Sequence, residues 1–149
     1  MRCLTLTQPW ATAVFLGLKH YETRSWRTNY RGPLLIHAAK GWKAEDRAFL
    51  RARMVAGQLT PKQCAELPFG VIIGRVDLVD CVPTATNQFS MGDAPEGEWL
   101  WGNYSSGRYV WKLANPVRFA EPIPYRGALG LFEVPDDALT AATRDQEAS

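Results

Sequence analysis

The feature that most restricts the fold is a series of short strand-like segments, each bounded by glycine, proline or other turn residues. Residues 2–7 alternate as a half-buried strand does, and residues 34–38 form an apolar run typical of a buried strand. Residues 69–81 predict a long strand in which Gly70 and Gly74 permit bending. Further strands are predicted at 19–26, 107–113, 117–120 and 129–134. A chain with this many short strands is expected to fold around a sheet.

Two helices are predicted among the early strands. Residues 10–17 repeat apolar side chains at helical spacing, with Thr7 as a capping hydroxyl and Pro9 in the first turn. Residues 42–56 combine an apolar face with a basic stripe at i, i+4 and i+8. That stripe consists of Lys43, Arg47 and Arg51. The predicted class is therefore α+β, a small mixed β-barrel of about six strands with two helices in its N-terminal half.

Length and composition indicate one globular domain. The chain has 149 residues, of which 46% are hydrophobic and 21% charged, as is usual for a protein with its own core. We expect residues 1–135 to form that domain. Residues 136–149 are small and acidic and are expected to be a mobile tail.

The sequence favours a cytoplasmic protein that does not enter a membrane. Its longest apolar stretches reach only about half of the ~20 residues that a spanning helix needs. The N-terminus runs directly into the first predicted strand, without the pattern of a secretory signal. Three widely spaced cysteines, Cys3, Cys64 and Cys81, form no metal or disulfide motif and are expected to be reduced thiols.

Charge is unevenly distributed along the chain. Residues 1–53 hold ten Lys and Arg against three Asp and Glu, whereas residues 54–98 hold two against six. The net charge of the whole chain is only +2. Clustered cations attract phosphate groups, so this asymmetry points mildly to an anionic ligand and equally fits a solvated surface.

Several common chemistries lack support. Only His20 and His37 are present, neither in a metal-binding spacing, and no phosphate-binding glycine loop or nucleophile elbow occurs. No metal and no cofactor is therefore expected. The segment 17–26 instead combines a lysine, a carboxylate, an arginine and two hydroxyls at a helix-to-strand transition. We expect the functional site there.

That segment resembles the signature of a known family. Gly17-x-Lys19-x-x-Glu22-x-Arg24 is similar to the Gly-x-Lys-x-x-Glu-x-Arg motif of the ASCH domain, a relative of the PUA fold. Four further segments resemble the family in the expected order, and together they cover most of residues 2–134. They are residues 4–11, 31–40, 102–111 and 126–132.

The resemblance implies a PUA-like β-barrel with a cleft beside the first helix that binds RNA or modified nucleosides. Some ASCH members are amidohydrolases that remove the acyl group of N4-acetylcytidine, and another is reported to cleave single-stranded RNA. Lys19 and Arg24 fall on the signature lysine and arginine. Glu22 stands where the bacterial deacetylases have a threonine nucleophile, and Thr23 and Thr5 are the nearest substitutes.

The leading hypothesis is an amidohydrolase that acts on N4-acylated cytidine. Lys19 and Glu22 would have acid–base roles, with water or a threonine as the nucleophile and Arg24 polarising the carbonyl. Thr23 completes the catalytic candidates. The rivals are a module that binds modified or single-stranded RNA, and a single-strand-specific ribonuclease that uses the same cleft. No membrane partner is expected, and the sequence indicates no protein partner.

The candidate substrate-binding residues each have a structural alternative. Trp10 and Trp26 are suited to stack on a pyrimidine or to pack in the core. Gln8 is suited to contact a base edge or to satisfy the start of a helix. His37 on an apolar strand favours a hydrogen-bonded core histidine over a ligand-binding one. The remaining candidates are Thr5 beside the first helix and Asn103, Tyr104 and Ser105 in a polar turn.

Overall fold

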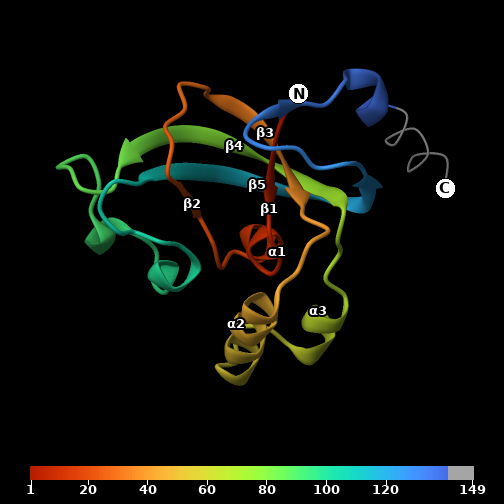
Figure 1. Ribbon diagram of the computed structural model, residues 1–149, viewed down its shortest axis with the longest axis horizontal. Helices are drawn as coiled ribbons and strands as arrows, with labels where there is room; N and C mark the ends of the chain where they lie inside the picture. The colour runs from red at the N-terminus through yellow and green to blue at the C-terminus, as the bar shows by residue number, and fades with distance from the viewer. Residues whose placement is uncertain (141–149) are drawn as a thin grey trace.

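The protein is an α+β molecule with one mixed sheet, seen in a computed structural model that describes residues 1–140 (Figure 1). Its strands are β1 (Arg2–Leu6), β2 (Tyr21–Arg24), β3 (Gly32–Ala38), β4 (Val71–Pro83), β5 (Tyr109–Pro124) and β6 (Phe132–Glu133). Its helices are α1 (Trp10–Phe15), α2 (Ala44–Val55) and α3 (Pro61–Ala65), with two short 3-10 helices, η1 (Met91–Asp93) and η2 (Glu98–Trp101).

The six strands form one open sheet in the order β2-β5-β4-β3-β1-β6. β1 and β3 are parallel and the other neighbours are antiparallel. The strand number and the α+β class are confirmed, but the expected barrel does not close because β2 and β6 are separate edges of the sheet. Both are short, and β6 offers only two residues for pairing.

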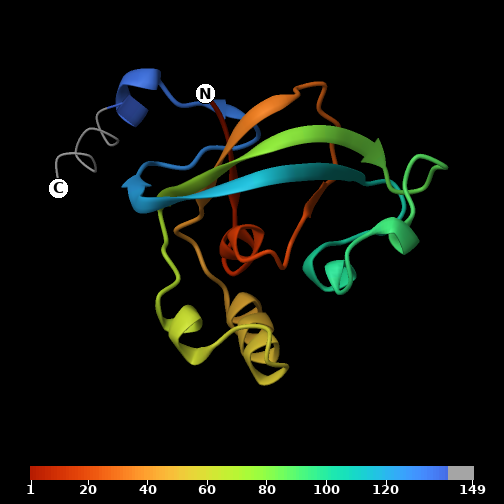
Figure 2. The same cartoon turned by 180° about the vertical axis from the view of Figure 1, so that it is seen from behind.

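The long hairpin of β4 and β5 dominates the sheet, as Figure 2 shows from behind. We expected two strands at 107–113 and 117–120, but residues 109–124 form one bent strand. Asn115 has a φ of 53°, and its side-chain amide donates to Asp77 Oδ2 at 2.9 Å. Three register shifts between β4 and β5 accommodate the bend, so the interruption in the sequence is a kink and not a chain break.

α1 lies between the sheet and the pair α2 and α3 (Figures 1 and 2). Its Ala11 and Val14 pack into the main core against the sheet, whereas Ala13 belongs to a second cluster with α2. In that second cluster Trp10 stacks on Phe49 at 4.6 Å between ring centroids. The two predicted N-terminal helices are therefore confirmed, with α1 buried on both sides.

The polar segment that follows α2 forms helix α3, whose N-cap is Thr60 and whose first residue is Pro61. Thr60 accepts from the Gln63 backbone N–H, and the Gln63 side chain accepts from the Thr60 N–H. This reciprocal capping and a proline in the first turn explain why so short a segment is helical.

The two ends of the domain meet at β6. The Met1 amino group binds Glu133 Oε1 at 2.8 Å and the Val134 carbonyl oxygen at 2.7 Å. Of the expected tail, residues 136–140 are helical, and Leu139 packs near β1 and β3. Residues 141–149 lie outside the part of the chain that the structure describes.

Gly74 should not tolerate a side chain, because a Cβ there would lie 2.5 Å from both Phe15 Cε1 and the Val117 carbonyl oxygen. We expect Gly74→Ala to lower the free energy of unfolding by about 1–3 kcal/mol through overpacking. Urea denaturation measures the change. Gly41→Ala is the matched control, since a Cβ at Gly41 meets nothing within 4 Å. Equal stability of the two variants would contradict the packing of α1 on β4.

Candidate functional site

A chain of three charged side chains forms the centre of the candidate site. Gly17, with a φ of 74°, turns the chain between α1 and Lys19, a buried residue just before β2. Glu22 and Arg24 are two residues apart on β2, so their side chains share one face of the strand. Lys19 Nζ lies 3.3 Å from Glu22 Oε1, and Arg24 Nη2 lies 2.9 Å from Glu22 Oε2. The sequence signature thus becomes a cation–carboxylate–cation series.

Accessibility increases along this series. The Lys19 side chain is fully buried, with 0% exposure, whereas those of Glu22 and Arg24 are 11% and 27% exposed. Lys19 Nζ donates to the Trp101 carbonyl oxygen at 2.7 Å. Arg24 Nη2 also donates to the Thr5 carbonyl oxygen at 2.8 Å, which ties β2 to β1. Lys19 is therefore shielded from solvent and does not line the cleft described below, whereas Arg24 is accessible from it.

The charges around Glu22 determine its protonation. Burial raises the pKa of Glu22, but the charges of Lys19 and Arg24, with hydrogen bonds from Arg24 and the Thr23 backbone, outweigh it. The resulting pKa lies below the ordinary value of 4.5. Glu22 is consequently ionised at neutral pH.

A second carboxylate brings the Trp101 carbonyl to Lys19. Glu98, at the start of η2, is 1% exposed, and its Oε1 accepts from the backbone N–H groups of His20 and Tyr21. Its Oε2 lies 2.9 Å from His20 Nδ1. These contacts attach the long connection between β4 and β5 to the start of β2. They therefore position the Trp101 carbonyl oxygen that accepts from Lys19.

Glu22 and Arg24 open into a polar cleft of about 560 Å³. Its walls come from the end of β1, the start of α1, β2, α2, and the segment from η2 to β5. The lining residues are Thr5, Leu6, Thr7, Trp10, Glu22, Thr23, Arg24, Asp46, Leu100, Trp101, Gly102, Asn103 and Arg108. Pockets of 300–1,000 Å³ hold small organic ligands, so this cleft has the size for a nucleoside.

Arg108 is a cation of the cleft that the sequence analysis missed. Its Nη2 donates to the Thr23 carbonyl oxygen at 3.0 Å and its Nε to the Asn103 carbonyl oxygen at 3.1 Å. Thr23 Oγ1 in turn accepts from the Asn103 N–H at 3.0 Å. The only available signal was a cation directly before the strand that pairs with β2.

Of the substrate-binding candidates, Thr5, Trp10 and Asn103 lie in this cleft and the others do not. Gln8 is buried. Its amide nitrogen donates to Thr12 Oγ1 and to the Pro68 carbonyl oxygen, and its amide oxygen accepts from the Thr12 N–H. Gln8 therefore caps the start of α1, a role that we expected Thr7 to have. Trp26 packs edge-on against Trp111 at 4.8 Å in the main core.

Tyr104 and Ser105 do not line the cleft. Tyr104 stacks on Phe89 with 5.6 Å between ring centroids, and its buried hydroxyl has no hydrogen-bond partner among the described residues. Ser105 is exposed and its carbonyl oxygen accepts from the Thr84 hydroxyl at 2.8 Å. In this turn only Asn103 contributes to the cleft.

His37 lies on the other side of Thr5. Its Nε2 donates to the Tyr125 carbonyl oxygen at 2.7 Å, and its Nδ1 lies 3.2 Å from Thr5 Oγ1. Burial lowers the pKa of His37 against the opposite effect of the Tyr125 bond, so the ring is neutral at pH 7. Since Nε2 carries the proton, Nδ1 accepts from the Thr5 hydroxyl. His37 lines a second cavity that also includes Thr5.

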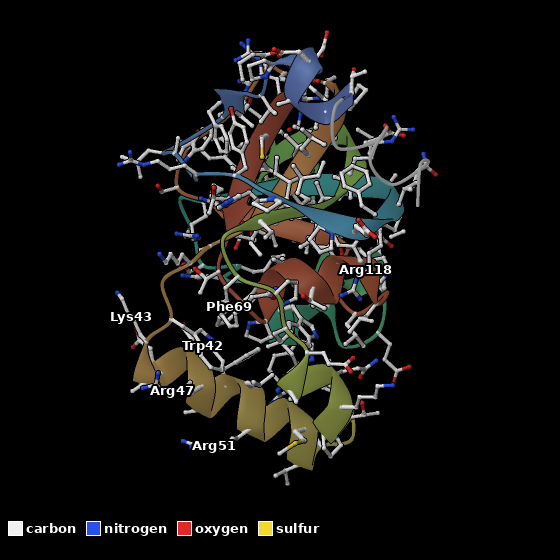
Figure 3. All side chains as sticks on the ribbon, turned by 90° about the vertical axis from the view of Figure 1, so that its right-hand side faces the viewer. Trp42, Lys43, Arg47, Arg51, Phe69 and Arg118 are labelled. Atoms are coloured by element: carbon white, nitrogen blue, oxygen red, sulfur yellow. The ribbon has the colours of Figure 1, made fainter. Side chains whose placement is uncertain are left out.

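The basic stripe predicted on α2 is exposed. Lys43, Arg47 and Arg51 follow one another along the outside of the helix in Figure 3, and the Arg47 guanidinium carbon lies 5.7 Å from the centre of the Trp42 ring. Arg118 lies well away from this helix in the same view. Asp46 of α2 lines the cleft, whereas none of the three cations of the stripe is among its lining residues.

Within residues 1–140, no group of three or more His, Cys, Asp or Glu side chains is placed to hold a metal ion. No helix in the same range is long and apolar enough to cross a membrane. Cys3, Cys64 and Cys81 are all free thiols.

The sequence profile of the ASCH domain matches residues 4–123, a span that contains the whole ionic series and every residue that lines the cleft. The chain belongs to the ASCH domain family. Activating signal cointegrator 1 from Mus musculus and from Homo sapiens are each 30% identical to it over 128 residues, or 84% of this chain. The aligned region is 21% of each of those proteins, so this ASCH chain spans about a fifth of their length.

Solved ASCH structures share the fold. The ASCH protein of Zymomonas mobilis matches with a TM-score of 0.58 and 13% identity, over 96% of this chain and 93% of the other. A mutant form of that protein matches with a TM-score of 0.56 and 13% identity, over 96% of both chains. The PUA-like arrangement expected of an ASCH domain is therefore present, as an open sheet.

Lys19 should stabilise the folded protein because its ammonium group balances the buried carboxylate of Glu22. We expect Lys19→Met to lower the free energy of unfolding by about 3–5 kcal/mol, the usual cost of removing one partner of a buried ion pair. Urea denaturation at pH 7 measures it, with the exposed Lys62→Met as control. Adding Glu22→Gln to Lys19→Met should recover part of the loss. A Lys19→Met protein as stable as the control would contradict the pairing.

The lowered pKa of Glu22 should make this part of the stability depend on pH. Because the folded pKa is below the unfolded one, the contribution is complete above the unfolded pKa near 4.5 and disappears as pH falls through the folded pKa. The stability difference between the native chain and Glu22→Gln should therefore shrink at acidic pH, measured by urea denaturation from pH 7 to 3. A difference that is constant over this range would show that Glu22 has an ordinary pKa.

Proposed function

We propose that the cleft binds the cytosine base of an N4-acylated cytidine and hydrolyses its acyl group. The observation that carries the proposal is an ionised carboxylate, Glu22, held in fixed orientation at the edge of a cleft of nucleoside size. Membership of the ASCH family supports a hydrolase-like or RNA-related role in general terms.

The groups around the cleft suit a cytosine derivative. A carboxylate accepts from the N4–H of cytosine, which remains in the N4-acyl form, and arginine N–H groups donate to carbonyl oxygens. Glu22 supplies the acceptor, while Arg24 and Arg108 supply donors. The indole of Trp10, half-buried in the cleft wall, offers a surface on which a pyrimidine can stack.

Water is the nucleophile in this proposal. Glu22 takes a proton from water as the water oxygen attacks the acyl carbon, and Arg24 stabilises the negative charge that develops on the carbonyl oxygen. The bond between the acyl carbon and N4 then breaks, and the proton passes from Glu22 to N4. The products are cytidine and a carboxylic acid. Thr23, whose Oγ1 accepts from Asn103 N–H, orients the substrate through its hydroxyl proton.

Lys19 has a positioning role in this mechanism. Its ammonium group is fully buried and donates to Trp101, so it orients Glu22 and lowers the pKa of that carboxyl without touching the substrate. This differs from the direct acid–base role that the sequence suggested for Lys19.

A specific observation also favours recognition of RNA without hydrolysis. The helix α2, which contributes Asp46 to the cleft, also carries a stripe of exposed cations, and such a stripe is suited to phosphate groups. In that function the same cleft would hold a modified or unpaired base. Cleavage of single-stranded RNA is the third alternative, in which Arg24 would stabilise the phosphorane.

Incubation with N4-acetylcytidine, followed by chromatography of released cytidine, tests the proposal. We expect the native chain to release cytidine. We also expect Lys19→Met/Glu22→Gln, which removes the carboxylate without leaving its cation buried, to lower kcat/KM by about 10²–10⁴-fold. Arg118→Ala, at a residue that does not line the cleft, is the control and should leave turnover unchanged.

The outcomes of this assay separate the candidates. Binding of cytidine by calorimetry without any turnover would contradict hydrolysis and leave base recognition. Shortening of a labelled single-stranded RNA under the same conditions would identify the ribonuclease. Retained turnover in the folded double variant would contradict the role assigned to Glu22.

A further inference from the structure

A second cavity adjoins the cleft across a single residue. It has a volume of about 900 Å³ and lies between the ends of β3 and β5. Its lining residues are Thr5, His37, Ala39, Lys40, Gly70, Pro124, Tyr125, Arg126, Gly127, Ala128 and Leu129. Thr5 lines both cavities, so the two cavities lie on either side of this residue.

The shared residue is held rigidly. The Thr5 carbonyl oxygen accepts from Arg24 Nη2 on the side of the cleft, and its hydroxyl bonds His37 on the side of the second cavity. Gly127 closes over this pair, because a Cβ there would lie 2.8 Å from His37 Cε1 and 3.1 Å from Thr5 Oγ1. The partition between the two cavities is therefore fixed by hydrogen bonds and close packing.

The second cavity is more apolar than the cleft and has no carboxylate, but it shares two kinds of side chain with the cleft. It has one half-buried aromatic ring, Tyr125, where the cleft has Trp10. It has two exposed cations, Lys40 and Arg126, where the cleft has Arg24 and Arg108. Neither Lys40 nor Arg126 forms an ion pair with another described residue. Aromatic rings beside unpaired cations are the usual means of binding successive nucleotides of a single strand.

We propose that the second cavity binds the nucleotide next to the cytidine in the cleft, so that the substrate is a cytidine within single-stranded RNA. The phosphate between the two nucleotides crosses Thr5, and Lys40 and Arg126 neutralise the strand. This inference rests on the proposed function, because it takes the cleft as the cytidine site. It extends that function from a nucleoside to a strand.

Calorimetry with cytidine and with two dinucleoside monophosphates, cytidylyl-(3′→5′)-adenosine and adenylyl-(3′→5′)-cytidine, tests this proposal. We expect one of the two dinucleotides to bind the native chain about tenfold more tightly than cytidine, since a stacked base and a neutralised phosphate are added. Lys40→Glu/Arg126→Glu should abolish that gain and change the affinity for cytidine less than twofold. Both residues are exposed, so the variant should fold.

Two control variants distinguish binding in the second cavity from binding elsewhere on the surface. Arg118→Glu reverses one cation on β5 outside both cavities and should leave every affinity unchanged. Lys43→Glu/Arg47→Glu/Arg51→Glu reverses the basic stripe of α2 and should leave the dinucleotide gain intact. A gain that this triple variant removes and Lys40→Glu/Arg126→Glu does not would overturn the proposal, because the strand would then follow α2.

Failure of this inference is distinct from failure of the proposed function. Cytidine binding with no dinucleotide gain overturns the second-cavity proposal alone. Absence of cytidine binding contradicts the proposed cleft function, and then a dinucleotide that still binds through Lys40 and Arg126 would contradict the shared path across Thr5.

Discussion

The candidate site depends on the burial of one ammonium group. Removing a charge from water costs several kcal/mol unless it is paired and hydrogen-bonded, and Lys19 meets both conditions through Glu22 and the Trp101 carbonyl. To satisfy Lys19, β2 must present Glu22 inward and η2 must reach the start of β2. Glu98 fixes the second of these by accepting from two backbone N–H groups there. One buried charge therefore organises three distant parts of the chain.

The same arrangement explains the chemistry of the cleft. Glu22 is shared between a fully buried cation and a partly exposed one, so its carboxylate is ionised and held in one orientation. Arg24 also donates to the Thr5 carbonyl oxygen, and the Thr5 hydroxyl bonds His37. A series of ion pairs and hydrogen bonds thus joins the buried lysine to the wall between the two cavities. Preorganisation of this kind supports both ligand recognition and catalysis.

Local patterns in the sequence predict the elements and part of the site. The two-residue spacing of Glu22 and Arg24 places them on one strand face, and helical periodicity identifies α1 and α2. Contacts between distant residues are not predictable in this way. The acceptor for Lys19 is a backbone carbonyl 82 residues away, and a carbonyl has no signature in the sequence. The kink at Asn115 likewise depends on Asp77, a partner that tertiary packing supplies.

The central claim is that Glu22 is an ionised carboxylate that meets the base in the cleft. Carbon-13 NMR of the glutamate side-chain carboxyls, with the Glu22 signal assigned, measures its titration and its response to cytidine directly. The account predicts a midpoint below the ordinary value of 4.5 and a shift of the Glu22 signal when cytidine is added at pH 7. A midpoint at or above 4.5, or a signal that saturating cytidine leaves unmoved, would contradict it.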